Sequence, residues 1–200
     1  MVNASPVSSK ATGSSWPWGK ILFIIGITTA IQAVILYMMG RVPVCECGTI
    51  RLFVNEVNSN ENSQQFFDWY TLSHIIHGFL FYGLFWLIAP KAPLHVRLLL
   101  ALGLEIGWEL VENSNFIIDR YRANTSSVDY FGDSILNSVF DTLSMVLGFF
   151  LAARLPIWVI VATAVFFEIL ALIVIRDNLI LNVIMLLHPF DFIRQWQSGS

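Results

Sequence analysis

Residues 104–113, L-E-I-G-W-E-L-V-E-N, place three carboxylates in a stretch whose other side chains are mostly apolar. In a helix, Glu105, Glu109 and Glu112 fall within about 60° of one another, on a single face. The whole chain is 56% hydrophobic and only 12% charged, whereas soluble domains are about 25% charged. Three ionised glutamates on one apolar helix would repel one another, so we expect them to share protons or to bind a cation.

Long apolar runs on both sides of this stretch predict an all-α, polytopic membrane helix bundle. A spanning helix needs about 20 mostly apolar residues. Five such segments are expected, at 19–40, 70–89, 94–117, 132–153 and 156–175. Prolines at 90, 93 and 156 lie between them, where helices start and stop. Residues 179–187 are apolar but too short to cross, so they predict a C-terminal interfacial or re-entrant helix.

Three regions are expected along the chain: a disordered cytoplasmic N-terminus at 1–15, a transmembrane bundle at 16–176 with an external loop at 41–69, and an amphipathic C-terminal segment at 177–200. The N-terminus is placed in the cytoplasm because the inner segments then carry lysine and arginine. A net charge of −3 and the lack of basic runs argue against a nucleic-acid partner. Membrane lipid is the expected neighbour, and a homo-oligomer is left open.

The external loop holds both cysteines of the chain, in C-E-C-G at 45–48. Cys45 and Cys47 are compatible with a local disulfide, with two ordinary thiols or with a pair of metal ligands. The stretch T-I-R-L-F-V-N-E-V-N at 49–58 alternates enough to predict a short strand or hairpin.

Two other spans also carry polar residues on one face, at a depth similar to that of the glutamates. His74 and His77 share one face of the second span, because they are three residues apart. The fourth span places Asp133, Asn137 and Asp141 one turn apart. At about 1.5 Å per residue, the three stripes lie roughly 6–14 Å below the same membrane face. We therefore expect one polar pocket between three helices in the outer half of the bilayer.

Neutral imidazoles combined with carboxylates form a nitrogen and oxygen site that suits zinc, manganese or iron. The expected metal ligands are His74, His77, Glu109 and Glu112. The spacing matches neither H-E-x-x-H enzymes nor di-iron bundles. The cluster therefore indicates a divalent metal without identifying it.

Three residues are expected to act in catalysis. Glu105 or Asp141 would serve as general base, and Asn137 would donate a hydrogen bond to a developing oxyanion. Substrate binding is assigned to Asp133 and to two arginines of D-R-Y-R at 119–122, namely Arg120 and Arg122. The arginines would clamp an anionic head group, or would reach to lipid head groups instead.

These roles predict a small metal-dependent membrane hydrolase that acts on a lipid or lipid-linked cell-envelope substrate from the outer face. Two alternatives stay open. A proton- or ion-coupled transporter would use the carboxylates as a pathway. A structural or assembly protein would use the buried polar network to set the register of its helices.

Several motifs resemble a known family. They are E-N-S-Q (61–64), D-W-Y-T-L-S-H-I-I-H-G-F-L-F-Y (68–82), E-I-G-W-E-L-V-E-N (105–113), D-R-Y-R (119–122) and G-D-S-I-L-N-S-V-F-D (132–141). They resemble a family of uncharacterised inner-membrane proteins of alphaproteobacteria, catalogued as a domain of unknown function. The resemblance covers about residues 40–155. It implies a multi-pass location in the bacterial inner membrane and implies no activity.

A looser likeness is to VanZ-type membrane proteins, in which a histidine opens one span, a glutamate lies in the next, an external arginine follows, and the next helix carries Asp, Asn and Gly. The residues that fill this pattern are His74 or His77, Glu109, Arg120 or Arg122, Asp133, Asn137 and Gly148. A second histidine, two more glutamates and Asp141 depart from it. The likeness implies a cell-envelope substrate.

Overall fold

The computed structural model describes residues 17–125 and 130–199. The N-terminal region expected to be disordered, 1–15, lies outside these residues. The described chain forms eight α-helices: α1 (Trp18–Met38), α2 (Thr71–Ile88), α3 (Leu94–Glu112), α4 (Asn115–Asn124), α5 (Ile135–Ala152), α6 (Ile157–Ile175), α7 (Leu179–Leu187) and α8 (Asp191–Ser198). The all-α prediction is therefore confirmed.

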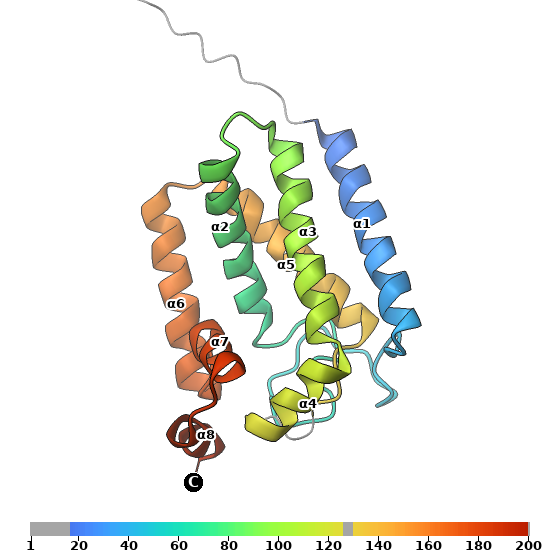
Figure 1. The fold of residues 1–200 in the computed structure, drawn as a ribbon, viewed down its shortest axis with the longest axis vertical. Helices are drawn as coiled ribbons and strands as arrows, with labels where there is room; N and C mark the ends of the chain where they lie inside the picture. Colours follow the sequence, from blue (N-terminus) through green and yellow to red (C-terminus); the bar gives the residue numbers. More distant parts are fainter. Residues whose placement is uncertain (1–16, 126–129, 200) are drawn as a thin grey trace, which may run out of the picture.

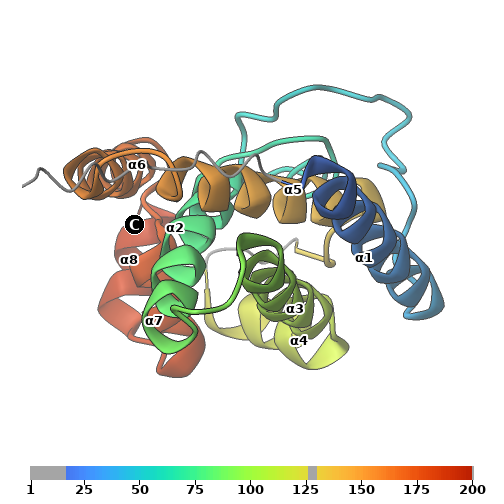
Figure 2. The same ribbon diagram turned by 90° about the horizontal axis from the view of Figure 1, so that it is seen from above.

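Four long helices and α3 form the bundle, and the loop 41–69 gathers with α4, α7 and α8 at one end of it (Figure 1). Seen from above, α3 lies between α1 and α2, with α5 behind it and α6 beyond α2 (Figure 2). Helices α3 and α6 each begin directly after a proline, Pro93 and Pro156. The prolines therefore mark the helix starts that the sequence predicts.

Four of these helices, α1, α2, α5 and α6, are long and apolar enough to cross a membrane. The span expected at 94–117 is not among them, because α3 carries Arg97 and three glutamates within 19 residues. Helix α2 runs away from the loop end and α5 starts again at that end, so α3 has to run the length of the bundle between them (Figure 1). Its neighbours on several sides bury its polar face.

The prediction of one continuous helix at 94–117 is wrong at the outer end of that segment. Helix α3 stops at Glu112, and α4 starts anew because the Ser114 hydroxyl accepts a hydrogen bond from the backbone N–H of Ile117. The arginines of the D-R-Y-R motif thus belong to a separate helix. The C-terminal segment likewise forms two short helices rather than one.

Helices α2 and α5 approach each other most closely at two glycines. A Cβ atom added to Gly78 would lie 2.5 Å from the backbone nitrogen of Phe149 and 2.8 Å from the carbonyl carbon of Gly148. A Cβ added to Gly148 would lie 3.0 Å from the carbonyl carbon of Ile75. Small residues allow such backbone contact between membrane helices. This contact brings the polar stripes of the two helices together.

The apolar core lies beside this contact. It consists of Ile21, Phe85, Leu98, Ala101, Leu102, Met145, Val146 and Phe149. By contrast, α6 buries only Ala171 and exposes large apolar side chains along its length. Such an apolar exterior on a bundle with spanning helices is what a lipid environment favours.

The strand or hairpin expected at 49–58 is wrong for the described residues. Within the part of the chain that the structure describes, the only strand pairing is one isolated parallel bridge between Phe53 and Phe67. Asp68 begins to cap α2 immediately after Phe67, with its carboxylate accepting from the backbone N–H groups of Tyr70 and Thr71. The segment that pairs with residues 49–58 therefore ends at Phe67 and is too short to extend the bridge into a β-ladder.

Candidate metal centre

The histidines of α2 and the first glutamate of α3 meet in the interior. Glu105, fully buried, lies 2.7 Å from His74 Nδ1 through its Oε1 and 3.0 Å from His77 Nδ1 through its Oε2. One carboxylate therefore holds both imidazole rings. Glu105 or Asp141 was expected to be the general base, and that role stays a prediction; both oxygens of Glu105 contact the histidines.

Glu109 lies one turn further along the same face of α3. Its Oε1 is 3.4 Å from His74 Nδ1 and receives no hydrogen bond from the described residues. Its Oε2 accepts a 2.6 Å hydrogen bond from the hydroxyl of Ser138, which in turn accepts one from Gln32 of α1. The network thus joins α1, α3 and α5, and it leaves one glutamate oxygen unpaired beside a histidine.

Asp141 of α5 closes the cluster from the other side of His74. Its Oδ2 lies 3.9 Å from His74 Nε2, and its Oδ1 accepts a hydrogen bond from the Thr71 hydroxyl. The two nitrogens of this one ring therefore face carboxylates from two different helices. The predicted convergence of α2, α3 and α5 is confirmed by these distances.

Two sets of side chains place potential ligand atoms within 4.8 Å of one another: His74 with His77 and Glu105, and His74 with Glu109 and Glu112. Both sets combine imidazole with carboxylate, the donors that suit zinc, manganese or iron. The residues fit such an ion because Glu109 Oε1, a buried ligand atom, receives no hydrogen bond from the described residues. All four expected metal ligands, and Glu105, thus belong to these two sets.

A second polar group lies at the start of α5, outside the helix itself. Asp133 accepts hydrogen bonds from Asn113 Nδ2 at 2.7 Å and from the Tyr130 hydroxyl at 3.1 Å. Burial raises the pKa of Asp133 to about 6, although the hydrogen bond from Asn113 favours its ionised form. The carboxyl therefore changes charge close to neutral pH.

Asn137, one turn into α5, is almost fully buried. Its Nδ2 donates to the backbone carbonyl of Gln65 at 3.0 Å, and its Oδ1 has no hydrogen-bond partner among the described residues. Its amide is thus fixed by the loop 41–69. The role expected for it, donation to an oxyanion, stays a prediction.

The two arginines of the D-R-Y-R motif point elsewhere. Arg120 donates to the backbone carbonyls of Leu186 and Leu187 at the end of α7. The Arg122 guanidinium lies 4.7 Å from the centre of the Phe131 ring. Neither residue lines the cavities described below, and their function as a head-group clamp stays a prediction.

Three cavities lie between the cluster and the loop 41–69, and neighbouring ones share lining residues. The inner one, of about 100 Å³, lies beside His77, Trp108 and α7. The middle one, of about 40 Å³, is lined by His74, Asp141 and Asn137 among others, and shares Tyr70, His74, Glu112 and Asn182 with the inner one. An outer cavity of about 320 Å³ shares Asn62 and Asp133 with the middle one. The cavities are therefore neighbours, arranged in order from the loop 41–69 to the histidines.

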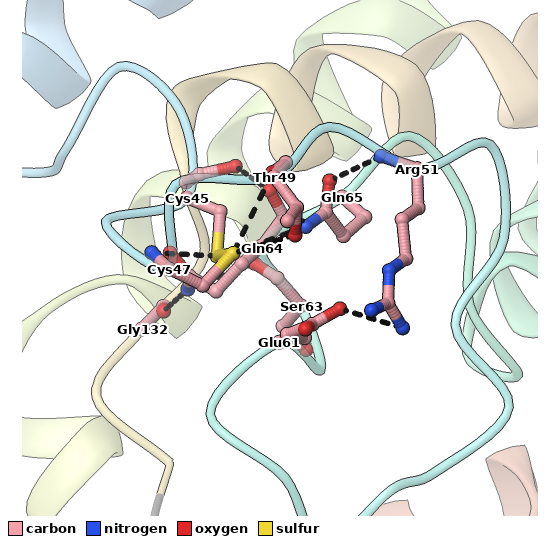
Figure 3. The surroundings of a disulfide bond; sticks show 10 residues. Cys45, Cys47, Thr49, Arg51, Glu61, Ser63, Gln64, Gln65 and Gly132 are labelled. Atoms are coloured by element: carbon pink, nitrogen blue, oxygen red, sulfur yellow. Dashed lines mark hydrogen bonds and ion pairs between the residues drawn. A yellow bond between two sulfur atoms is a disulfide. The ribbon is translucent and has the colours of Figure 1, made fainter.

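The loop contains a disulfide between Cys45 and Cys47 (Figure 3). Of the three arrangements compatible with C-E-C-G, the structure has the local bridge. The neighbouring Gln65, almost fully buried, donates to Cys47 Sγ and to the carbonyl of Thr49. Because the Gln65 carbonyl also holds Asn137, the bridge is connected to the site through one residue.

Sequence reasoning missed Ser138, Asn113 and Arg41. Ser138 directly follows Asn137 in S-I-L-N-S, and a hydroxyl in a polar stripe was a usable signal. Asn113 ends the quoted glutamate stretch and donates to Asp133. Arg41, which lines the outer cavity, is an isolated residue after α1, and no pattern in the sequence marks it.

Comparison with protein families gives one match. The model described as "Protein of unknown function (DUF2585)" matches residues 36–199. A UPF0314 protein of Brucella anthropi is 63% identical over 195 residues, which cover 98% of this chain and 99% of the relative. A UPF0314 protein of Sinorhizobium fredii is 50% identical over 199 residues, covering 100% of each chain.

A further relative, the UPF0314 protein of Paracoccus denitrificans, is 51% identical over 182 residues, which cover 91% of this chain and 92% of the relative. No solved structure matches the chain. The comparisons support the resemblance to an uncharacterised alphaproteobacterial family. They do not extend to VanZ-type proteins, and that looser likeness stays a prediction.

Proposed function

The chain belongs to the DUF2585 family, whose description assigns no activity, and we propose that it is an integral membrane metalloenzyme that hydrolyses a lipid or lipid-linked cell-envelope substrate. The observation that supports this most is the meeting of His74, His77 and Glu105, within reach of one ion, beside a series of neighbouring cavities that starts at the loop 41–69. A purely structural network would not need a row of cavities that reaches its histidines.

A bound zinc, manganese or iron ion would supply Lewis-acid polarisation of a carbonyl or phosphoryl oxygen. His74 and His77 would hold it, with Glu109 or Glu105 as the carboxylate ligand. Glu105 contacts both rings and so orients them, which is the function that carboxylates beside ligating histidines commonly have. Ser138 positions Glu109 in the same way.

Asp141 is the carboxylate best placed to act as general base. It lines the middle cavity next to His74, and one of its oxygens accepts a hydrogen bond from Thr71. Glu105 is less suited because both of its oxygens already contact imidazoles. Asp141 would take a proton from the attacking water in the middle cavity, next to His74.

The apolar exterior of the bundle and the position of the cavities support a substrate with a lipid part. The site lies near the end of the bundle that carries the loop 41–69 (Figure 1), so a head group can enter from that side while an acyl or prenyl chain stays in the bilayer. The proposal places this end on the outer face of the bacterial inner membrane.

Metal content tests the first half of the proposal. The full chain, purified in detergent and stripped with a chelator, is incubated with zinc, manganese or iron and analysed for bound metal. We expect stoichiometric binding that is lost in His74→Ala and kept in His95→Ala, a histidine control outside the cluster. Absence of metal from the wild-type protein under all three conditions would contradict the proposal.

Turnover tests the second half. Metal-loaded protein is incubated with a total envelope lipid extract, and products are followed by mass spectrometry. Asp141→Asn should keep its metal and lose about 10²- to 10⁴-fold of the rate, the usual contribution of a general base. If this variant binds metal and turns over at the wild-type rate, Asp141 is not the base. Ion-driven uptake into vesicles with no lipid product would favour a transporter instead.

A further inference from the structure

The outer cavity lies apart from the metal centre and has a different chemical character. It is formed by the end of α1, the loop 41–69 and the segment before α5, and its volume of about 320 Å³ falls in the range of small-molecule pockets, about 300–1,000 Å³. Most of the side chains that line it are polar, among them Arg41, Glu46, Asn60, Asn62, Gln64 and Asp133.

Side-chain amides are the commonest polar groups in this lining, contributed by Asn60, Asn62 and Gln64. An amide offers donors and an acceptor at once, and so does each hydroxyl of a ligand. The charged groups are one arginine and two carboxylates, Glu46 and Asp133. An anionic ligand would therefore meet more negative than positive charge. A neutral ligand with several hydroxyl groups could form hydrogen bonds with the amides, the arginine and the carboxylates alike.

Two buried polar atoms in the lining lack hydrogen-bond partners within the described residues. They are Asn62 Oδ1, an acceptor, and Arg41 Nε, a donor. The Arg41 side chain is held in place because its Nη1 donates to the backbone carbonyl of Phe131 at 2.7 Å. A buried polar group without a partner is costly. A ligand that offers both a donor and an acceptor would relieve this cost after a small movement of the Arg41 and Asn62 side chains.

The walls of the cavity are already ordered. Gln64 Nε2 donates to the carbonyl of Gly132 at 2.7 Å, next to the disulfide (Figure 3). The backbone N–H of Ser134 donates to the carbonyl of Ser63 at 2.9 Å, and the Ser134 hydroxyl donates to the Gln64 carbonyl. Such preorganisation lowers the entropic cost of binding.

The position of the cavity connects it to the metal centre. Asn62 and Asp133 line both the outer and the middle cavity, and the middle cavity also contacts His74 and Asp141. A group bound in the outer cavity is therefore adjacent to the space in which the reaction is proposed to occur.

We propose that the outer cavity binds the carbohydrate head group of the substrate, a neutral sugar bearing hydroxyl or amide groups, rather than a phosphate. As a substrate assignment this rests on the proposed function, because it makes the substrate a glycolipid or a lipid-linked sugar. Sugar binding itself needs only the outer cavity, so the two ideas can fail separately.

Saturation-transfer NMR on the full chain in nanodiscs tests the proposal. The probes are free glucose, N-acetylglucosamine and maltose, with glycerol phosphate as the anionic comparison. We expect transfer to sugar protons in the wild-type protein and in His74→Ala, which lacks the metal site. Asn62→Ala should raise the sugar dissociation constant about fivefold to tenfold, the loss of one hydrogen bond.

Asn60→Ala, at an exposed position of the same cavity, gives a second variant with little risk to folding. Asn58→Ala, an exposed amide of the same loop outside the lining, is the matched control and should behave as wild type. Equal sugar signals in all variants, no sugar signal in any of them, or binding of glycerol phosphate alone would each overturn the proposal. Sugar binding by a protein that binds no metal would keep it and refute the metalloenzyme.

Discussion

Replacing Gly78 by alanine should force α2 and α5 apart. The new methyl group would lie 2.5 Å from the backbone nitrogen of Phe149 and 2.8 Å from the carbonyl carbon of Gly148. Non-bonded carbon contacts are normally about 3.5–4.0 Å, so the helices would have to separate by about 1 Å. The obstructing atoms belong to the backbone, and no side chain can rotate away to make room.

The expected cost follows from two opposing effects. Overpacking of this kind costs up to about 3 kcal/mol, while alanine gains about 1 kcal/mol over glycine within a helix. Gly78→Ala should therefore lose about 2 kcal/mol of unfolding free energy. Gly83→Ala lies on the same helix with no atom within 4 Å of its added methyl, so it should gain about 1 kcal/mol. The two variants should differ by about 3 kcal/mol.

Chemical unfolding in detergent micelles, followed by circular dichroism, measures this difference. Metal affinity gives a second readout, because α2 carries both histidines and α5 carries Ser138, whose hydroxyl positions Glu109. Separation of the helices should weaken binding in Gly78→Ala and leave it unchanged in Gly83→Ala. Equal stability of the two variants would refute the close backbone contact and, with it, the reason given for the convergence of the polar stripes.

Three further outcomes are expected. Ser138→Ala removes the 2.6 Å hydrogen bond to Glu109, so zinc binding measured by isothermal titration calorimetry should be about 10- to 100-fold weaker. The control is Ser144→Ala, because the Ser144 hydroxyl donates to a carbonyl of its own helix. Equal zinc affinities of the two variants would contradict the positioning of Glu109 by Ser138. The pKa of Asp133 is about 6 in the folded protein, raised from 3.8 by burial, so the folded state holds this proton more tightly and stability falls as pH rises from about 4 to 6. Asp133→Asn should remove up to about 3 kcal/mol of that pH dependence of the unfolding free energy. If the unfolding free energies of the wild-type protein and the variant change in parallel with pH, Asp133 is not its source. Glu168→Leu removes the acceptor for the backbone N–H groups of Leu179 and Ile180, so hydrogen exchange at the start of α7 should be about fivefold faster, and an unchanged rate would show that this cap contributes nothing.

Helical periodicity was sufficient to predict which helices contribute polar residues to the site. His74, Glu109 and Asp141 lie on three different helices, and their common depth could be worked out from the rise per residue and the alternation of the spans. Glu105, which contacts both histidines, was expected nearer the midplane. Helix ends were predicted less well. The break between α3 and α4 was missed although Ser114, a good N-cap residue, stood in the sequence, because the apolar residues on both sides suggested one continuous helix.

The outer cavity was beyond prediction for a different reason. It depends on contacts between distant parts of the chain, such as Gln64 with Gly132 and Arg41 with Phe131. Irregular loops follow no period, so nothing local in the sequence indicates where their side chains lie. The orientation of Arg120 toward α7 has the same origin, since it depends on where two short C-terminal helices pack.

The disulfide of the loop 41–69 has a consequence for how the chain is inserted. Cys45 and Cys47 enclose a single residue, and the closure of so short a loop restricts the unfolded chain little. Disulfides persist in the bacterial periplasm and are rare in the cytosol. The bridge therefore contributes little to stability, and it agrees with the expected exposure of this loop to the periplasm. A maleimide reagent added to intact cells should leave both sulfurs unmodified until a reductant is supplied, whereas a loop retained in the cytoplasm would be alkylated at once by a membrane-permeant reagent.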